Sequence, residues 1–118
     1  MKNNDIQRKS LAFSKRVVFA YQYLCNTKKE FVLSKQFLRS GTSIGANIRE
    51  AQYAQGKKDF ISKLEIALKE ASETGYWLEL LLKTNYIDTI KYREFDNNCS
   101  QIRVMLIKSI NTAKGDEK

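Results

Sequence analysis

Apolar residues recur at intervals of three and four along the first part of the chain, from Asp5 to Asn26. This spacing places them on one face of an α-helix. The apolar stripe consists of Ile6, Phe13, Val17, Ala20, Tyr21 and Leu24. Asp5 is a suitable N-cap residue, and the polar residues 26–30 follow as a connection. The pattern therefore predicts a first helix over residues 5–26.

A second periodic segment follows Ser34 and predicts a helix over residues 34–53. Its stripe consists of Phe37, Gly41, Ile44, Ile48 and Ala51. Gly41 and Gly45 each cost about 1 kcal/mol relative to alanine in the interior of a helix. The side chains of this stretch are small, so close approach of another backbone would offset that cost.

Two further stripes predict helices over residues 57–84 and 88–112. The third stripe consists of Phe60, Leu64, Ala67, Ala71, Thr74, Leu78 and Leu81. The fourth consists of Ile90, Phe95, Cys99, Ile102, Leu106 and Ala113. Four helices joined by short links favour an all-α, up-and-down antiparallel four-helix bundle. We expect one domain over residues 1–118, with a frayed tail at 114–118.

The composition supports long helices and a single core. The chain has 118 residues, five glycines and no proline, and proline and glycine are the residues that interrupt helices. No stretch approaches the roughly 20 consecutive apolar residues that a membrane span needs. The first five residues also lack an apolar signal-peptide segment. We therefore expect a cytoplasmic protein that makes no use of a membrane.

The residue types needed for common catalytic chemistry are scarce. Histidine is absent, which removes the commonest general base and the commonest metal ligand. Cys25 and Cys99 are far apart, so no metal-ligand spacing exists. The carboxylates of the third predicted helix, such as Glu65 and Glu73, alternate with lysines and are typical of a solvated surface. We expect no catalytic residues, no metal, no cofactor and no enzymatic activity.

The third predicted helix is apolar over more than half of its circumference. At about 100° per residue, one flank of its stripe carries Ile66, Trp77 and Leu80. Such a wide arc is typical of a central core helix and equally of a helix that contributes to a subunit interface. Both interpretations stay open, and Ile66, Trp77 and Leu80 are the candidate interface residues.

The net charge of +8 is concentrated in the N-terminal half of the chain. Residues 1–30 carry seven basic and two acidic groups, whereas residues 57–85 carry five of each. The candidate nucleic-acid-binding residues on the first two helices are Arg8, Lys9, Lys15, Arg16, Lys35, Arg39 and Arg49. A basic half of this kind attracts a polyanion such as nucleic acid, or an acidic protein, but it is also typical of a merely well-solvated surface. Such a surface contacts phosphates without reading bases.

The sequence from Phe31 to Ala51 resembles a known family over its most specific stretch. FVLSKQFLRSGTSIGANIREA is followed by Asp59-Phe60 and by IALKEASETGYWLEL at residues 66–80. These segments resemble the four-helix-bundle family named for proteins encoded in intervening sequences of bacterial 23S ribosomal RNA genes. The motif residues Asn47 and Glu50 match, and they fit structural hydrogen bonding between helices as well as a functional role.

The resemblance implies an assembly as well as a fold. It implies a ring-like homopentamer, and kinship with the accessory protein of diversity-generating retroelements, whose basic pentamer binds a reverse transcriptase and nucleic acid. The role of the intervening-sequence proteins themselves is unresolved. Two hypotheses follow: an oligomeric adaptor whose basic face binds RNA or another nucleic acid, and a protein-interaction scaffold whose basic face docks an acidic protein or a reverse transcriptase.

Overall fold

The computed structural model describes residues 3–115 of the chain, and these residues form four helices. The helices are α1 (Asn3–Asn26), α2 (Leu33–Ala51), α3 (Lys57–Lys83) and α4 (Thr89–Gly115). The four predicted helices are confirmed, with ends that shift by a few residues. Because α4 continues to Gly115, the predicted frayed tail is helical at Lys114 and Gly115. The rest of that tail, residues 116–118, lies outside the described part of the chain.

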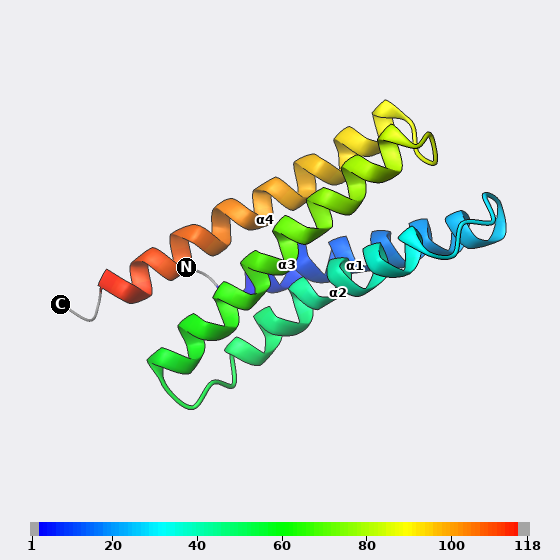
Figure 1. Ribbon diagram of the computed structural model, residues 1–118. Coiled ribbons are helices and arrows are strands. Elements are labelled where there is room, and N and C mark those ends of the chain that lie inside the picture. The colour runs from blue at the N-terminus through cyan, green and yellow to red at the C-terminus, as the bar shows by residue number, and fades with distance from the viewer. Residues whose placement is uncertain (1–2, 116–118) are drawn as a thin grey trace.

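The helices run up and down along an elongated bundle that measures 50 × 22 × 20 Å (Figure 1). α1 packs beside α2 and α4, and α3 packs beside the same two helices. The α1–α2 and α3–α4 connections lie at one end of the bundle, and the α2–α3 connection lies at the other (Figure 1). This arrangement confirms the predicted all-α antiparallel four-helix bundle.

The predicted apolar stripes face one another and form the core. Leu64, Leu78 and Leu81 of α3 are fully buried, as are Ile44 and Ile48 of α2. Three phenylalanine rings from different helices meet edge to face: the Phe95 centroid lies 5.6 Å from that of Phe37 and 6.0 Å from that of Phe13. Such aromatic pairs add to the free energy of burial, so α1, α2 and α4 are joined at this level.

Ile90 was assigned to the wrong side of its helix. Ile90 is 70% exposed, because it lies five residues before Phe95, a spacing that turns it to the outer side of α4. In the first turn of α3, Ile61 is buried, whereas Phe60 is half-buried against the edge of the core. The α3 stripe therefore includes Phe60, whereas Ile90 lies at the beginning of α4, where few neighbouring turns constrain the period.

The glycines of α2 are explained by close packing against α1. A Cβ atom on Gly41 would lie 2.9 Å from both methyl carbons of Val17, and one on Gly45 would lie 3.4 Å from the backbone oxygen of Ser10. Real Cβ atoms avoid the first distance, so Gly41 is needed for Val17 to be buried there. The expected close approach is therefore present, and at Gly41 its partner is a side chain and not a backbone.

Glu30 caps the beginning of α2, which the sequence pattern does not predict. Its carboxylate accepts hydrogen bonds from the backbone N–H groups of Val32 (3.1 Å), Leu33 (2.9 Å) and Ser34 (2.6 Å). Ser34 lies inside the helix, where its hydroxyl donates to the backbone oxygen of Glu30 at 2.7 Å. The carboxylate thus satisfies backbone donors that would otherwise lack a partner at the helix N-terminus.

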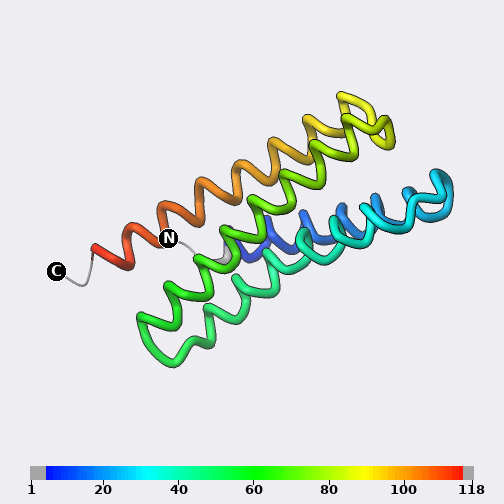
Figure 2. Tube along the Cα trace, viewed as in Figure 1, coloured from blue at the N-terminus to red at the C-terminus, as the bar shows by residue number. Residues whose placement is uncertain are grey.

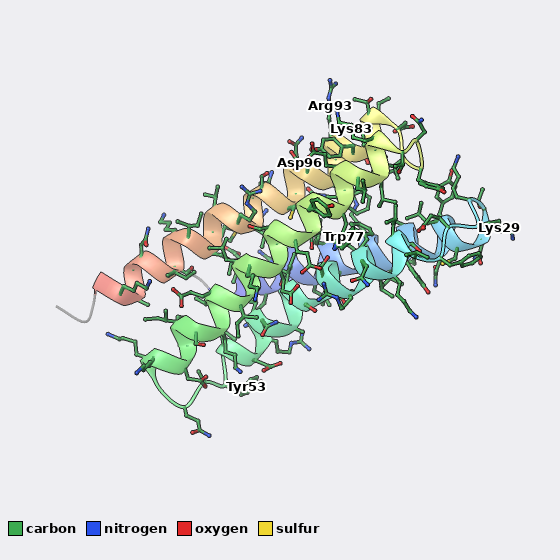
Figure 3. The ribbon with its side chains drawn as sticks, viewed as in Figure 1. Lys29, Tyr53, Trp77, Lys83, Arg93 and Asp96 are labelled. Atoms are coloured by element: carbon green, nitrogen blue, oxygen red, sulfur yellow. The ribbon has the colours of Figure 1, made fainter. Side chains whose placement is uncertain are left out.

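The two connections that share one end of the bundle are separated from each other. In the Cα trace, the α1–α2 connection (cyan) and the α3–α4 connection (yellow-green) diverge (Figure 2). Lys29 lies at the tip of the first, and Tyr53 lies at the opposite end of the molecule (Figure 3). Among residues 3–115, no helix has the length and apolar character that crossing a membrane requires.

Candidate nucleic-acid interface

Several of the basic residues predicted on α1 and α2 are exposed and have no carboxylate partner within residues 3–115. Lys9, Lys15, Lys35 and Arg49 all have exposed side chains. None of these four forms an ion pair with a carboxylate within residues 3–115. Their charges therefore remain available to an anionic partner.

Arg39 is instead directed toward α3. Its guanidinium pairs with the carboxylate of Glu70 at 3.3 Å and also with that of Glu73. Glu73 additionally accepts a hydrogen bond from the indole N–H of Trp77 at 2.9 Å. The charge of Arg39 is thus offset by two carboxylates, which makes it a weaker candidate for a phosphate contact than the sequence suggests.

Two arginines of α1 also have carboxylate partners. Arg8 pairs with Asp5 of its own helix at 2.7 Å, and Arg16 pairs with Glu94 of α4 at 3.0 Å. Both pairs are partly open to water, so each contributes little to the free energy of folding. The guanidinium of Arg16 also lies 5.2 Å from the ring centroid of Phe95, a cation–π arrangement that fixes it against the core.

The predicted basic residues do not share one face. Lys9 and Arg16 line a groove between α1 and α4, where Asn98 lies opposite. Arg49 lines a groove of about 420 Å³ between α1 and α2, whose lining also includes the apolar Leu11 and the acidic Glu50. The structure therefore spreads the positive charge around α1 and over the adjacent outer side of α2.

A cleft with a volume of about 690 Å³ lies between the second half of α1 and the α3–α4 connection. We call it the aromatic cleft. On the α1 side it is lined by Arg16, Phe19, Tyr23 and Lys28. On the other side it is lined by Tyr86, Asp88, Lys91 and Phe95.

Phe19 and Tyr23 are not among the predicted site residues, although the sequence carries a signal for them. They are four residues apart on α1 and lie outside its core stripe, which places two exposed aromatic rings on one side of the helix. An aromatic pair outside the core stripe of a helix indicates an exposed apolar surface that could bind a ligand. Tyr86 belongs to the α3–α4 connection, far from Phe19 and Tyr23 in the sequence, so the helical pattern alone does not place it beside them.

The two motif residues from the family resemblance have structural contacts. Asn47 donates a hydrogen bond from its side-chain amide to the backbone oxygen of Ser43, at 2.9 Å, within α2. Glu50 pairs with Lys63 of α3, with 3.6 Å between carboxylate oxygen and ammonium nitrogen. The expectation of hydrogen bonding between helices therefore does not describe Asn47, while Glu50 joins two helices through its charge.

The candidate interface residues of α3 differ in exposure. Ile66 is exposed, whereas Leu80 and Trp77 are half-buried. Trp77 packs against the edge of the core, and Glu73 satisfies its indole N–H within the same helix. Part of the wide apolar arc is thus covered inside one chain, and Ile66 is the member that the bundle leaves uncovered.

The cysteines are free thiols in different environments. Cys99 is buried and donates a hydrogen bond to the backbone oxygen of Ala71 at 3.4 Å, whereas Cys25 is half-buried. Burial raises the pKa of the Cys99 thiol to about 11. Within residues 3–115, histidine, cysteine and acidic side chains form no cluster of three or more that could hold a metal ion.

A family model and a solved structure both match the chain over most of its length. The model of the family described as 23S rRNA-intervening sequence protein matches residues 2–108. A crystal structure of a protein of unknown function from the S23 ribosomal protein family of Bacteroides thetaiotaomicron VPI-5482 is 57% identical to the chain, with a TM-score of 0.93. The match covers 94% of this chain and 99% of that chain. No functionally curated protein matches.

Proposed function

The chain belongs to the family of 23S rRNA-intervening sequence proteins, and we propose that it is a non-catalytic adaptor that binds nucleic acid, RNA foremost, through the basic exterior of α1 and α2. The proposal goes beyond family membership, because the structural relative is itself described as a protein of unknown function. It depends on a property of this chain's own surface.

The uncompensated charge of α1 and α2 is the observation that carries the proposal. Asp5 is the one acidic residue of α1, and Glu50 is the one acidic residue of α2. Glu50 pairs with Lys63 of α3, so it offsets no charge of α1. The exposed cations Lys15, Lys35 and Arg49 therefore set up a positive field that attracts a chain of phosphates.

Contacts of this kind act on the backbone of the nucleic acid. Each phosphate that the protein neutralises releases counterions, so the logarithm of the binding constant falls linearly with the logarithm of the salt concentration. Because base edges are not read, the adaptor discriminates weakly between sequences. Binding that is steep in salt and tolerant of sequence is the expected signature.

Fluorescence anisotropy with a labelled RNA hairpin across a salt series tests the proposal. The variant combines Lys15→Glu, Lys35→Glu and Arg49→Glu, all at exposed positions. The matched control combines Lys69→Glu, Lys83→Glu and Lys108→Glu, which make the same change in net charge at exposed positions of α3 and α4. We expect the first variant to bind at least about tenfold more weakly than the control and to have a shallower salt dependence.

Two results would contradict the adaptor. One is the absence of binding by the wild-type protein at low salt. The other is an equal loss of affinity in both variants, which would mean that only net charge matters. Partners that remain bound in a pull-down after nuclease treatment would instead favour the scaffold hypothesis, in which the basic surface docks an acidic protein such as a reverse transcriptase.

We also propose that the protein is a homo-oligomer whose subunits meet at the outer side of α3. Ile66 and Tyr76 are exposed there, and the half-buried Leu80 lies on the same side of the helix. The family resemblance implies a pentamer. Ile66→Glu leaves the core intact, so it should lower the mass measured by light scattering without unfolding the chain, and a wild-type monomer would contradict this interface.

A further inference from the structure

The exposed surface of the aromatic cleft is not accounted for by phosphate contacts. Phe19 is 57% exposed and Tyr23 is 48% exposed, so a large part of each ring faces solvent. One turn of helix separates them, which places both rings on the same wall of the cleft. Two neighbouring exposed aromatic rings are costly in water and provide flat apolar surfaces for a ligand.

The rest of the cleft provides a firm base and a cationic edge. Phe95, buried in the core, forms part of the base, and Arg16 lies against its ring. The ammonium group of Lys15 lies 5.9 Å from the ring centroid of Phe19. Positive charge is therefore held directly beside the aromatic surfaces.

The charge balance of the cleft favours an anionic ligand. Its lining includes the basic residues Arg16, Lys28 and Lys91 and one carboxylate, that of Asp88. The Asp88 carboxylate caps α4 by accepting the backbone N–H of Lys91 at 2.7 Å. Glu94, outside the lining, pairs with Arg16 and Lys91, and the ammonium of Lys28 has no ion-pair partner within residues 3–115.

We propose that the aromatic cleft binds unpaired bases of a single-stranded nucleic acid, with Phe19 and Tyr23 as stacking surfaces and Lys28 and Lys91 close to the phosphates. This inference rests on the proposed nucleic-acid adaptor and specifies the form of nucleic acid that it prefers. A duplex keeps its bases stacked on one another, whereas an unpaired base has a free face for an aromatic ring. The volume of about 690 Å³ lies within the roughly 300–1,000 Å³ that is usual for ligand sites.

The experiment compares a labelled single-stranded RNA with a duplex of the same length by fluorescence anisotropy. The test variant combines Phe19→Ala and Tyr23→Ala. The control combines Phe31→Ala and Tyr53→Ala, which removes the same two ring types from exposed positions outside the cleft. Neither variant changes the net charge, so a difference between them reports on the position of the rings.

We expect the test variant to bind the single strand about tenfold more weakly or worse, and the duplex within about twofold of wild type. Its salt dependence should be unchanged, because phosphate contacts are kept. Phe19→Tyr combined with Tyr23→Phe preserves both rings and should restore single-strand binding. The control should match wild type with both ligands.

The failures of the two proposals are distinguishable. Unchanged single-strand binding by the Phe19→Ala and Tyr23→Ala variant, with binding still lost in the charge-reversal variant, overturns the stacking site alone. An equal loss for single strand and duplex, or a change in oligomeric mass, overturns it as well. If the wild type binds neither RNA at low salt, both proposals are wrong.

Discussion

Replacing Glu30 by glutamine tests the unusual cap of α2. Only 8% of the Glu30 residue surface is exposed, yet its carboxylate accepts three backbone hydrogen bonds at the beginning of the helix. The amide of glutamine keeps the size of the side chain but has one acceptor oxygen in place of two. At least one backbone donor among Val32, Leu33 and Ser34 must then lose its partner.

The expected loss of stability follows from the number and type of these bonds. Hydrogen bonds to a charged group contribute about 1.5–3 kcal/mol each, and the burial of the carboxylate offsets part of their sum. Replacing an N-cap side chain generally costs about 0.5–2 kcal/mol. We therefore expect Glu30→Gln to lower the free energy of unfolding by about 2 kcal/mol, or Tm by roughly 5–10 °C.

The same contacts predict how that loss depends on pH. Burial acts to raise the pKa of Glu30. This effect is outweighed by hydrogen bonds from the backbone N–H groups of Leu33, Ser34 and Val32 and from the Ser34 side chain, so the pKa is lowered. A lowered pKa in the folded state gives stability that is present above the unfolded pKa of about 4.3 and is lost as the pH falls through the folded value. The difference between wild type and Glu30→Gln should thus be constant above about pH 5 and shrink below about pH 4.

Urea unfolding followed by circular dichroism measures this difference at each pH. Glu79→Gln is the control, because Glu79 is exposed and forms no ion pair within residues 3–115. Its free energy of unfolding should stay within about 0.5 kcal/mol of wild type. A charged cap at Glu30 is contradicted if Glu30→Gln is as stable as this control, or if its loss of stability persists unchanged at low pH.

Two other predictions concern packing and thiol reactivity. Gly41→Ala should destabilise the protein by about 1–3 kcal/mol, because its Cβ would lie 2.9 Å from both methyl carbons of Val17, which is buried and cannot easily move. Gly75→Ala, where no atom lies within 4 Å of the added carbon, should stabilise it by about 0.5–1 kcal/mol in the same urea assay, and equal signs would contradict the packing argument. With a thiol-alkylating reagent at about pH 8, mass spectrometry should find Cys25 modified long before Cys99, since Cys99 is buried and its pKa is raised to about 11, whereas equal rates in the folded protein would contradict its burial.

The periodicity of apolar residues predicts the bundle well because each helix is long enough to repeat its pattern several times. An error arises where the pattern is short, as at Ile90 near the beginning of α4. The cap by Glu30 is missed for another reason: cap rules describe short side chains placed next to the helix, whereas Glu30 uses a longer chain from three residues before Leu33. Gly41 could be flagged from its cost in a helix, but its contact with Val17 depends on tertiary packing.

The sequence predicts which basic residues lie on the candidate binding surface, but it does not predict which of them form ion pairs. A count of charges finds the basic residues of α1 and α2, but it cannot tell that Arg39 faces Glu70 and Glu73. That pairing requires α2 and α3 to be neighbours with a fixed rotation about their axes. The aromatic cleft is even less predictable from the sequence, because it brings together Phe19 and Tyr86, which come from segments far apart along the chain.

The pattern of ion pairs within residues 3–115 leaves unpaired cations on both α1 and α2. Carboxylates of α3 pair with Arg39 of α2 and with Lys114 of α4, and Lys63 of α3 pairs with Glu50. Within residues 3–115, no ion pair joins α1 to α2. These two helices instead approach closely through small residues such as Gly45, which brings like charges onto adjacent surfaces. The packing that the α2 glycines permit therefore leaves the unpaired cations of the two helices on neighbouring surfaces, where a polyanion would neutralise them.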